Sequence, residues 1–402
     1  MTHLSTTLVP TPGKKTGERP DEKSERAAGR RPGTRLPAAA RALGVFAAAR
    51  LTGLVAVAVA AHLTHQDTFR LLGRSWDSRW YLGIAAHGYG RTLHFGPDVT
   101  QSDLAFFPLY PALVRAVTTV TPLSSGAAGL LLSWLAAALS AYGIYLLTAR
   151  LRGPRTAAFL VALWALLPHS VILSLAYTEP VLTAFAAWSL YALLTGRWLW
   201  AGTLAALAGL SRPNGFAVAA AVLATAAYEI GRRRGRVAGR VWAGAALAPL
   251  GWGAYVLWVG VRTGDPLGGY FTVQREWGSR FDFGAGSLAF AKHVLLDGDR
   301  FVFSMTLVLV AAAVLLYALL LADRPPLALA VYTGVLLLIT VGGSGFFESK
   351  PRFLLPAFPL LLPLACALTK ARRRSAHLVV GALAGLSLAY GTYLVAIADM
   401  PL

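Results

Sequence analysis

Long apolar runs separated by short polar stretches follow one another along most of the chain. Many approach the roughly 20 residues that an α-helix needs to cross the hydrocarbon core of a bilayer, and this length fits spanning helices and not the strands of a barrel. Eleven runs are predicted to be spans: 43–64, 126–149, 155–174, 177–195, 198–211, 213–230, 241–262, 301–322, 326–343, 353–369 and 376–397. We therefore expect an all-α integral membrane protein, a polytopic bundle of about 11 transmembrane helices.

The first 42 residues form a different kind of segment. They are polar and basic, with almost no large apolar side chains, which is typical of a disordered tail. The run that begins near Leu43 is too long for a cleaved signal peptide and stands behind too long a tail, so we interpret it as a retained first span. We expect residues 1–42 to be a disordered cytoplasmic tail and residues 43–402 to form one membrane domain.

The segment 104–121 is apolar but contains two prolines and an arginine, so its place relative to the membrane is ambiguous. Lys and Arg concentrate in cytoplasmic loops, and this rule resolves the ambiguity. If 104–121 does not cross, the basic tail and three basic clusters all face the cytoplasm: 150–155, 232–240 and 370–374. We therefore predict a cytoplasmic N-terminus, an external C-terminus, a large external loop at 65–125 with two interfacial helices, and a second external loop at 263–300.

Composition agrees with a membrane protein and narrows its partners. The chain is 56% hydrophobic and 14% charged, with a mean hydropathy of +0.57, whereas soluble domains carry about 25% charged residues. The net charge of +19 is concentrated between apolar runs, so we assign it to membrane topology and anionic lipid. No basic and aromatic surface module is visible, and we expect no nucleic-acid partner. The single cysteine, Cys366, excludes an internal disulfide.

The most informative stretch, 76–89, follows the first apolar run and places Asp77 between Trp76 and Trp80. Aromatic residues of this kind prefer the boundary between lipid headgroups and hydrocarbon. A carboxylate held there is a candidate base for a substrate at the membrane surface. In a helix, four side chains share one face, with Asp77 beside it near Tyr81: Trp76, Trp80, Ile84 and His87. The alternative is an amphipathic interfacial helix whose Asp77 only caps its start.

Further polar residues fall at the predicted external ends of the spans. Asp103 precedes the two prolines of the loop and is either a second acid or a helix N-cap. Glu179, in Tyr177-Thr178-Glu179-Pro180, either orients an acceptor hydroxyl or pairs with Arg212. Arg212 opens a turn with Asn214, which is either a helix corner or a phosphate contact.

Several of these motifs occur in the order of a known family. Trp76-Asp77 is followed by Ile84-Ala85-x-x-Gly88-Tyr89, by Ala105-Phe106-Phe107-Pro108-x-x-Pro111, by Pro168-His169-Ser170 and Ser174-Leu175-Ala176-Tyr177-Thr178-Glu179, and by Ser211-Arg212-Pro213-Asn214-Gly215. Over about 75–215 this pattern resembles the PIG-V type of GPI mannosyltransferase, a group of the polytopic GT-C glycosyltransferases. The chain departs from the family at Ala86, where relatives often carry an acidic residue before His-Gly-Tyr.

The resemblance implies a GT-C-like membrane enzyme that transfers a sugar, expected to be mannose, from a polyprenyl-phosphate sugar to an acceptor hydroxyl on the outer face. By position in the first external loop, Asp77 would be the catalytic acid residue. The leaving phosphate calls for cations, and guanidinium groups pair with phosphate in a bidentate fork. The candidates are Arg212, Arg275, Lys350 and Arg352; for the last two, snorkelling to lipid headgroups is an alternative. Direct displacement with one base predicts inversion at the anomeric carbon.

Substrate contacts are expected from residues around the base: Trp76, Trp80, Tyr81, Asp103, Tyr177, Glu179 and Asn214. The second external loop is either an acceptor-binding loop or a solvated one. No histidine pair has ligand spacing, so we predict no metal site; Asp297-Gly298-Asp299 is the only weak candidate. The sequence leaves the acceptor open among a glycolipid, a polymer and a protein. A flippase or transporter of lipid-linked sugars is the main alternative function, and a purely structural membrane protein is the third.

Overall fold

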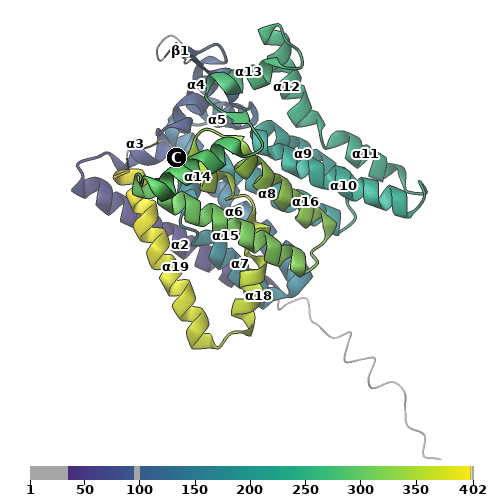
Figure 1. Ribbon diagram of the computed structural model, residues 1–402. Helices are drawn as coiled ribbons and strands as arrows, with labels where there is room; N and C mark the ends of the chain where they lie inside the picture. The colour runs from purple at the N-terminus through teal and green to yellow at the C-terminus, as the bar shows by residue number, and fades with distance from the viewer. Residues whose placement is uncertain (1–34, 95–99, 399, 401–402) are drawn as a thin grey trace, which may run out of the picture.

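The computed structural model describes residues 35–94, 100–398 and 400, and helices dominate it (Figure 1). The predicted tail lies mostly outside the described residues. The first described helix, α2, runs over Arg35–Leu63, so it begins before the position near Leu43 that hydropathy predicts. The expected all-helical bundle is confirmed, with two small two-stranded sheets in the part of the chain that the structure describes.

The segment after α2 folds as a compact loop at one end of the bundle, the upper end in Figure 1. Its elements are α3 (Thr68–Gly73), α4 (Asp77–His87), β1 (Thr92–His94), β2 (Thr100–Ser102), η2 (Asp103–Ala105) and α5 (Leu109–Val120). β1 and β2 pair antiparallel, with Leu93 opposite Gln101. α4 and α5 are the two helices expected in this loop. At 1.5 Å per residue, the 12 residues of α5 are too short to cross a bilayer alone.

The middle of the chain forms the packed centre of the bundle. It comprises α6 (Ser125–Arg152), α7 (Pro154–Ala165), η3 (Ser170–Ser174), α8 (Glu179–Leu194), α9 (Trp198–Ser211), η4 (Pro213–Gly215), α10 (Phe216–Arg232), α11 (Gly239–Leu247) and α12 (Leu250–Thr263). The core includes the fully buried side chains Trp164, Ile144 and Leu160. Glycines allow the closest approaches: a Cβ on Gly202 would lie 2.2 Å from the carbonyl oxygen of Gly244, so α9 and α11 meet backbone to backbone.

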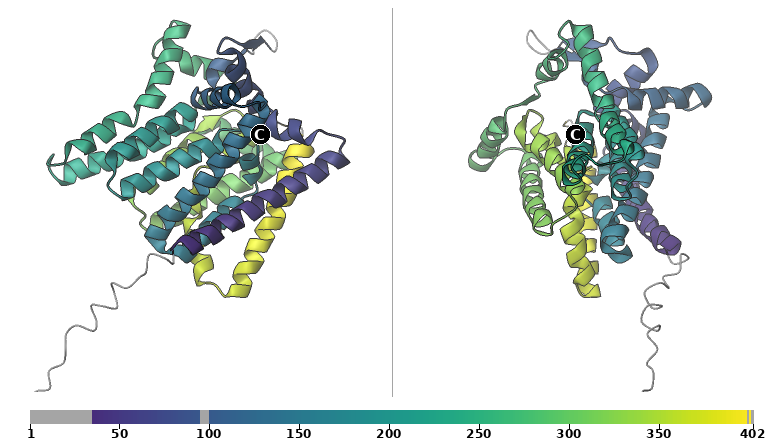
Figure 2. Two further views of the ribbon diagram at one scale, coloured as in Figure 1. Left: turned by 180° about the vertical axis from the view of Figure 1, so that it is seen from behind. Right: turned by 90° about the vertical axis from the view of Figure 1, so that its right-hand side faces the viewer.

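The remaining elements complete the bundle and return the chain to its upper end. They are α13 (Gly269–Glu276), β3 (Arg280–Phe281), α14 (Ala285–Leu296), α15 (Phe301–Ala322), α16 (Leu327–Gly342), β4 (Gly343–Ser344), η5 (Phe347–Ser349), α17 (Lys350–Phe353), η6 (Phe358–Leu361), α18 (Leu362–Lys370) and α19 (Arg373–Ala396). α19 packs along α2, as the reverse view also shows (Figure 2). β3 pairs antiparallel with β4, which ties the second predicted loop to the segment that carries Lys350 and Arg352.

The count of about 11 spans is not confirmed. Among the described residues, six helices are long and apolar enough to cross a membrane, or seven if η5–α17 and η6–α18, bent by 77°, count as one broken span. Each predicted apolar run nevertheless coincides with a helix or with a pair of helices. The run 155–174 departs most, because α7 ends at Ala165 and irregular backbone follows.

Arg50, in the middle of α2, shows how irregular backbone is accommodated there. Its guanidinium donates to the carbonyl oxygens of Ala165 and Ser170 and, at 2.7 Å, to the Ser170 hydroxyl. Backbone carbonyls that lack helical partners need such donors when they are away from water. This charge within a predicted span therefore has a structural explanation.

Candidate functional site

A cavity of about 1060 Å³ opens between the upper loop and the ends of the central helices. It is lined from α4, from the corner between α9 and α10, from α13 and from the segment 339–353. Seven cationic side chains line it: Arg79, Arg91, Arg212, Arg275, Arg280, Lys350 and Arg352. Among the described residues, Asp77 is the single acidic one in that lining. The cavity therefore favours an anionic ligand and offers it one carboxylate.

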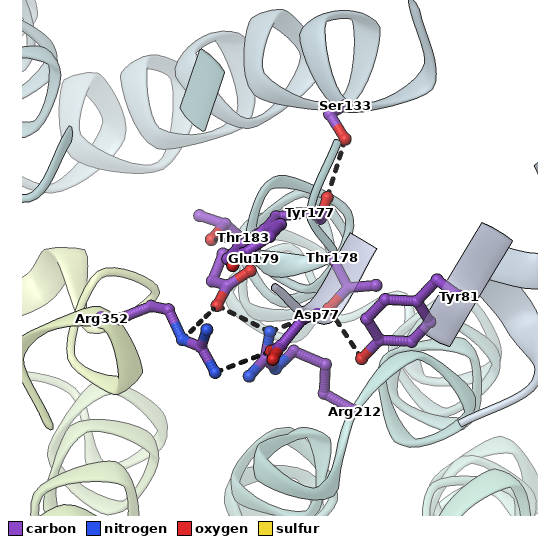
Figure 3. Close-up of polar contacts among 9 residues, drawn as sticks. All are labelled: Asp77, Tyr81, Ser133, Tyr177, Thr178, Glu179, Thr183, Arg212 and Arg352. Atoms are coloured by element: carbon purple, nitrogen blue, oxygen red, sulfur yellow. Dashed lines mark hydrogen bonds and ion pairs between the residues drawn. The ribbon is translucent and has the colours of Figure 1, made fainter. Parts of the chain in front are cut away.

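Four charged side chains at the floor of this cavity form a chain of alternating sign (Figure 3). Arg352 Nη2 lies 2.8 Å from Asp77 Oδ2, and its Nε lies 3.0 Å from Glu179 Oε1. The same Glu179 oxygen lies 2.6 Å from Arg212 Nη1, which confirms the predicted Glu179–Arg212 pair. Arg352 thus bridges two carboxylates, and Glu179 bridges two arginines.

The two carboxylates differ in access. The side chain of Asp77 is 22% exposed, whereas that of Glu179 is 1% exposed and does not line the cavity. A substrate in the cavity can reach Asp77 but not Glu179. Glu179 is therefore placed to hold the arginines, and the structure does not support the expectation that it orients an acceptor hydroxyl.

Local structure explains why these charges are tolerated at their positions. Asp77 and Glu179 are the first residues of α4 and α8, where the positive end of the helix dipole stabilises a carboxylate. Arg212 follows the last residue of α9, where the dipole favours a cation. Pro180 and Pro213 stand at helix starts, where a missing N–H group costs nothing.

The alternative in which Asp77 only caps a helix is not what the structure shows. Trp76 occupies the cap position of α4, without a side-chain cap hydrogen bond, and the Asp77 carboxylate pairs with Arg352 instead. The predicted apolar face is also wrong in part, because His87 is exposed. Trp76 and Trp80 are partly exposed and line the cavity.

A polar relay extends from Arg212 toward α4. Arg212 Nη1 donates to Thr178 Oγ1 at 2.9 Å, and Thr178 Oγ1 donates to the Tyr81 hydroxyl at 3.3 Å. Burial raises the pKa of Tyr81 to about 12, so this phenol is neutral at physiological pH. Sequence analysis quoted Thr178 only within its motif and did not select it, although its place beside Glu179 was the available signal.

Tyr177 precedes Thr178 in the chain, and its side chain is buried in the protein, outside the cavity lining. The Arg352 guanidinium lies 5.3 Å from the centre of the Tyr177 ring. The Tyr177 carbonyl oxygen accepts a hydrogen bond from Ser133 Oγ at 2.7 Å. Tyr177 is fully buried and does not line the cavity, so its predicted contact with substrate is not supported.

Asp103 is likewise outside the cavity lining. Its buried carboxylate accepts hydrogen bonds from the backbone N–H groups of Gly90 and Arg91, at 2.9 and 2.8 Å. Gly90 adopts a φ of +135°, which an L side chain rarely adopts. The Arg91 side chain then lies over the Trp80 ring, at 5.3 Å. The expectation of a second acid is not supported: Asp103 fixes the turn that positions Arg91.

The other predicted cations also line the cavity, and they differ in how many hydrogen bonds they already make to the protein. The Lys350 ammonium donates to the carbonyl oxygens of Thr340 and Gly343, at 2.6 Å each. Arg275 donates to Thr272 Oγ1 at 2.7 Å and is exposed. Arg352 Nη1 and Asn214 Nδ2 have no hydrogen-bond partner among the described residues. Both atoms are buried, although other atoms of Arg352 and Asn214 line the cavity.

Several aromatic residues of the lining were not singled out from the sequence: Phe216, Trp252, Phe281, Phe346 and Phe353. Trp80, Phe106 and Trp277 stack in one group, with ring centres 5.1–5.6 Å apart. The charge pattern of the loop 263–300 pointed to Arg275 but gave no signal for Arg280, which only the β3–β4 pairing brings to the cavity. In the described ranges, no group of three or more His, Cys, Asp or Glu residues is placed to hold a metal ion.

Comparisons with known proteins agree with this architecture. Residues 105–252 match the family described as dolichyl-phosphate-mannose-protein mannosyltransferase. That match includes Glu179 and Arg212 but neither Asp77 nor Arg352. No curated protein sequence matches the chain.

Solved structures show the same fold at low identity. ArnT from Cupriavidus metallidurans in the apo state has a TM-score of 0.50 at 16% identity, over 76% of this chain and 57% of that one. ArnT bound to undecaprenyl phosphate has a TM-score of 0.51 at 16% identity, over 82% and 60%. The oligosaccharyltransferase of Archaeoglobus fulgidus in the apo form has a TM-score of 0.45 at 15% identity, over 86% and 55%. The chain thus has the GT-C-like fold expected from the sequence and spans less than two thirds of the length of these structures.

Proposed function

We propose that this chain is a membrane glycosyltransferase that moves a sugar from a polyprenyl-phosphate donor to an acceptor hydroxyl, with Asp77 as the general base. The observation that carries the proposal is the placement of one accessible carboxylate in a cavity with seven cations. A hydrolase that acts through two carboxyl groups would need a second accessible acid near the first. Here the neighbouring acid, Glu179, is buried between two arginines.

The reaction is a single displacement. The acceptor oxygen attacks the anomeric carbon, its proton passes to the Asp77 carboxylate, and the bond between that carbon and the phosphate oxygen breaks. The electron pair leaves with the phosphate, whose added charge is stabilised by guanidinium donors. Arg352, Arg212 and Arg275 line the cavity and are the guanidinium groups proposed for this role. A β-linked donor gives an α-linked product.

The aromatic and apolar parts of the lining suit the rest of a lipid-linked sugar. Trp80, Trp277 and Phe106 form one aromatic group in the cavity wall, beside which a sugar can pack, and Asn214 lines the same cavity. We propose mannose as the sugar, because the matched family and the PIG-V resemblance both concern mannosyl transfer. The acceptor is a glycolipid, a polymer or a protein.

We also propose the arrangement in the membrane. Residues 43–402 form the transferase domain, the loops 65–125 and 263–300 lie on the external face of the cell membrane, and the N-terminus is cytoplasmic. The basic connection between α18 and α19 lies at the end opposite to α4, the lower end in Figure 1, as the positive-inside rule requires of this orientation.

The test is transfer of radiolabelled mannose from polyprenyl-phosphate mannose to membrane acceptors, with wild type compared to Asp77→Asn. Loss of the base is expected to lower the rate on the order of 10²-fold or more. Asp297→Asn is the matched control: it makes the same change in an exposed residue outside the cavity and should retain the wild-type rate. Equal turnover by Asp77→Asn would remove the assignment. Movement of donor lipid across vesicles without product would favour the flippase instead.

A further inference from the structure

A second basic hollow lies on the opposite side of α4 from Asp77. Asp77, Trp80, Tyr81 and Ile84 follow the spacing of one helical face, and Arg79, Leu82, Gly83 and Ala86 follow the spacing of the other. The second face borders a groove of about 730 Å³ between α3, α4 and the start of α6, called here the α3–α4 groove. Its described lining includes Arg70, Arg74, Arg79, Arg91, His87 and Phe69, and contains no carboxylate.

The positive charge of the α3–α4 groove is not compensated by the protein. Its four arginines are exposed, and none of them forms an ion pair with any described residue. Arg79 Nε donates only to the carbonyl oxygen of Arg74, at 3.0 Å. Asp67 accepts a hydrogen bond from the backbone N–H of Arg70 and lies outside the described lining. Four guanidinium groups facing one hollow repel one another unless an anion lies between them.

The location of the groove indicates where that anion comes from. α2 and α6 are candidate spans, and the groove is lined by the segment that connects them and by Ser125, the first residue of α6. Two consecutive spans end and begin at the same membrane face, so the groove lies at the level of lipid headgroups. Phe69 is 43% exposed at its edge and offers an apolar contact for an acyl chain.

We propose that the α3–α4 groove binds the phosphate group of an anionic lipid. Arginine side chains recognise phosphate oxygens through charge-assisted, often bidentate hydrogen bonds. Arg79 and Arg91 also line the cavity that contains Asp77, so the bound lipid contacts the same helix and turn that carry the proposed base. Binding requires no sugar transfer and can be measured without a donor.

The experiment is a titration of the purified full chain in detergent, followed by native mass spectrometry. The probes are phosphatidylglycerol and phosphatidylcholine with identical acyl chains, and inorganic phosphate as competitor. One phosphatidylglycerol molecule is expected to bind more tightly than phosphatidylcholine. Arg70 and Arg74 do not line the Asp77 cavity, so the variant Arg70→Gln with Arg74→Gln should weaken this binding roughly 10- to 30-fold.

Three variants separate the explanations. Arg70→Lys with Arg74→Lys keeps the charge and should retain most of the binding, which excludes a folding defect at these positions. Arg262→Gln removes one charge from an exposed arginine outside both cavities and should have no effect. Asp77→Asn should bind the lipid normally even where transfer is lost. Equal binding of the two lipids, an unchanged affinity in the glutamine variant, or displacement by inorganic phosphate would each overturn the proposal.

Discussion

Replacing Glu179 by glutamine tests whether this residue positions the two arginines of the site. The substitution removes one charge and keeps the size of the side chain. Glu179 is 1% exposed, and its Oε1 lies 2.6 Å from Arg212 and 3.0 Å from Arg352. Removing one partner of a buried ion pair costs about 3–5 kcal/mol, because the other charge remains buried. The amide oxygen still accepts a hydrogen bond and both arginines border the cavity, so we expect the low end, about 3 kcal/mol.

The loss is measurable as a lower melting temperature and a changed response to the donor. For a domain of this length, a cost of this size corresponds to a drop in Tm of about 4 °C. Arg212 and Arg352 lose their common anchor, so the KM for the polyprenyl-phosphate donor should rise about tenfold, while Asp77 remains and kcat falls less. Asp77→Asn should show the reverse pattern, with a large loss of kcat. The assays are thermal unfolding in detergent and initial rates over a range of donor concentrations.

Glu229→Gln is a matched control, since Glu229 also contacts two arginines, Arg232 and Arg233, at 3.0 and 2.6 Å. Those arginines are 55% exposed, and exposed pairs contribute little, so Tm and rates should stay near wild type. If Glu179→Gln melts like wild type and loses kcat without a change in donor KM, Glu179 contacts the acceptor, and the positioning role is wrong.

Two further substitutions follow from the same geometry. Arg352→Lys keeps the charge, but its single nitrogen cannot replace the two that contact Asp77 and Glu179. We expect kcat/KM in the transfer assay to fall about 10²-fold. A wild-type value would show that the planar guanidinium is not required. Asp103→Asn weakens the acceptor for two backbone N–H groups at Gly90 and Arg91, at a cost of about 1–3 kcal/mol; thermal unfolding should show a lower Tm, and an unchanged Tm together with a large loss of rate would return Asp103 to the list of reacting residues.

The sequence predicted those parts of the fold that hydropathy and local turn chemistry determine. The runs 198–211 and 301–322 coincide with α9 and α15, because polar or turn residues bound each of them. The run 155–174 was misjudged because its second half is held by contacts from a distant helix, those of Arg50 in α2. The run 353–369 contains three prolines, and the chain bends there by 77°.

Sequence analysis selected the four charged residues that the structure brings together, but it predicted only one of the ion pairs among them. Asp77, Glu179, Arg212 and Arg352 were each selected for charge at a predicted external end, and the Glu179–Arg212 pair was one of two stated alternatives. The bridge from Arg352 to Asp77 joins positions that are remote in the chain, and hydropathy carries no signal for such a contact. Asp103 was selected as a second acid because the sequence does not show that its carboxylate is buried against the backbone of Gly90 and Arg91.

The charge balance at the floor of the cavity suggests how the proposed base becomes free to act. Two carboxylates and two guanidinium groups neutralise one another, with Arg352 shared between Asp77 and Glu179. A lipid phosphate that enters the cavity brings a further negative charge and competes with Asp77 for Arg352. Glu179 is buried, so Arg352 stays paired with it through Nε while Nη2 turns from Asp77 to the phosphate. Asp77 then loses its cationic partner, and its carboxylate oxygens are free to contact the acceptor hydroxyl. On this reasoning donor binding precedes activation of the acceptor, and an arginine with two carboxylate partners, one accessible and one buried, is what links the two events.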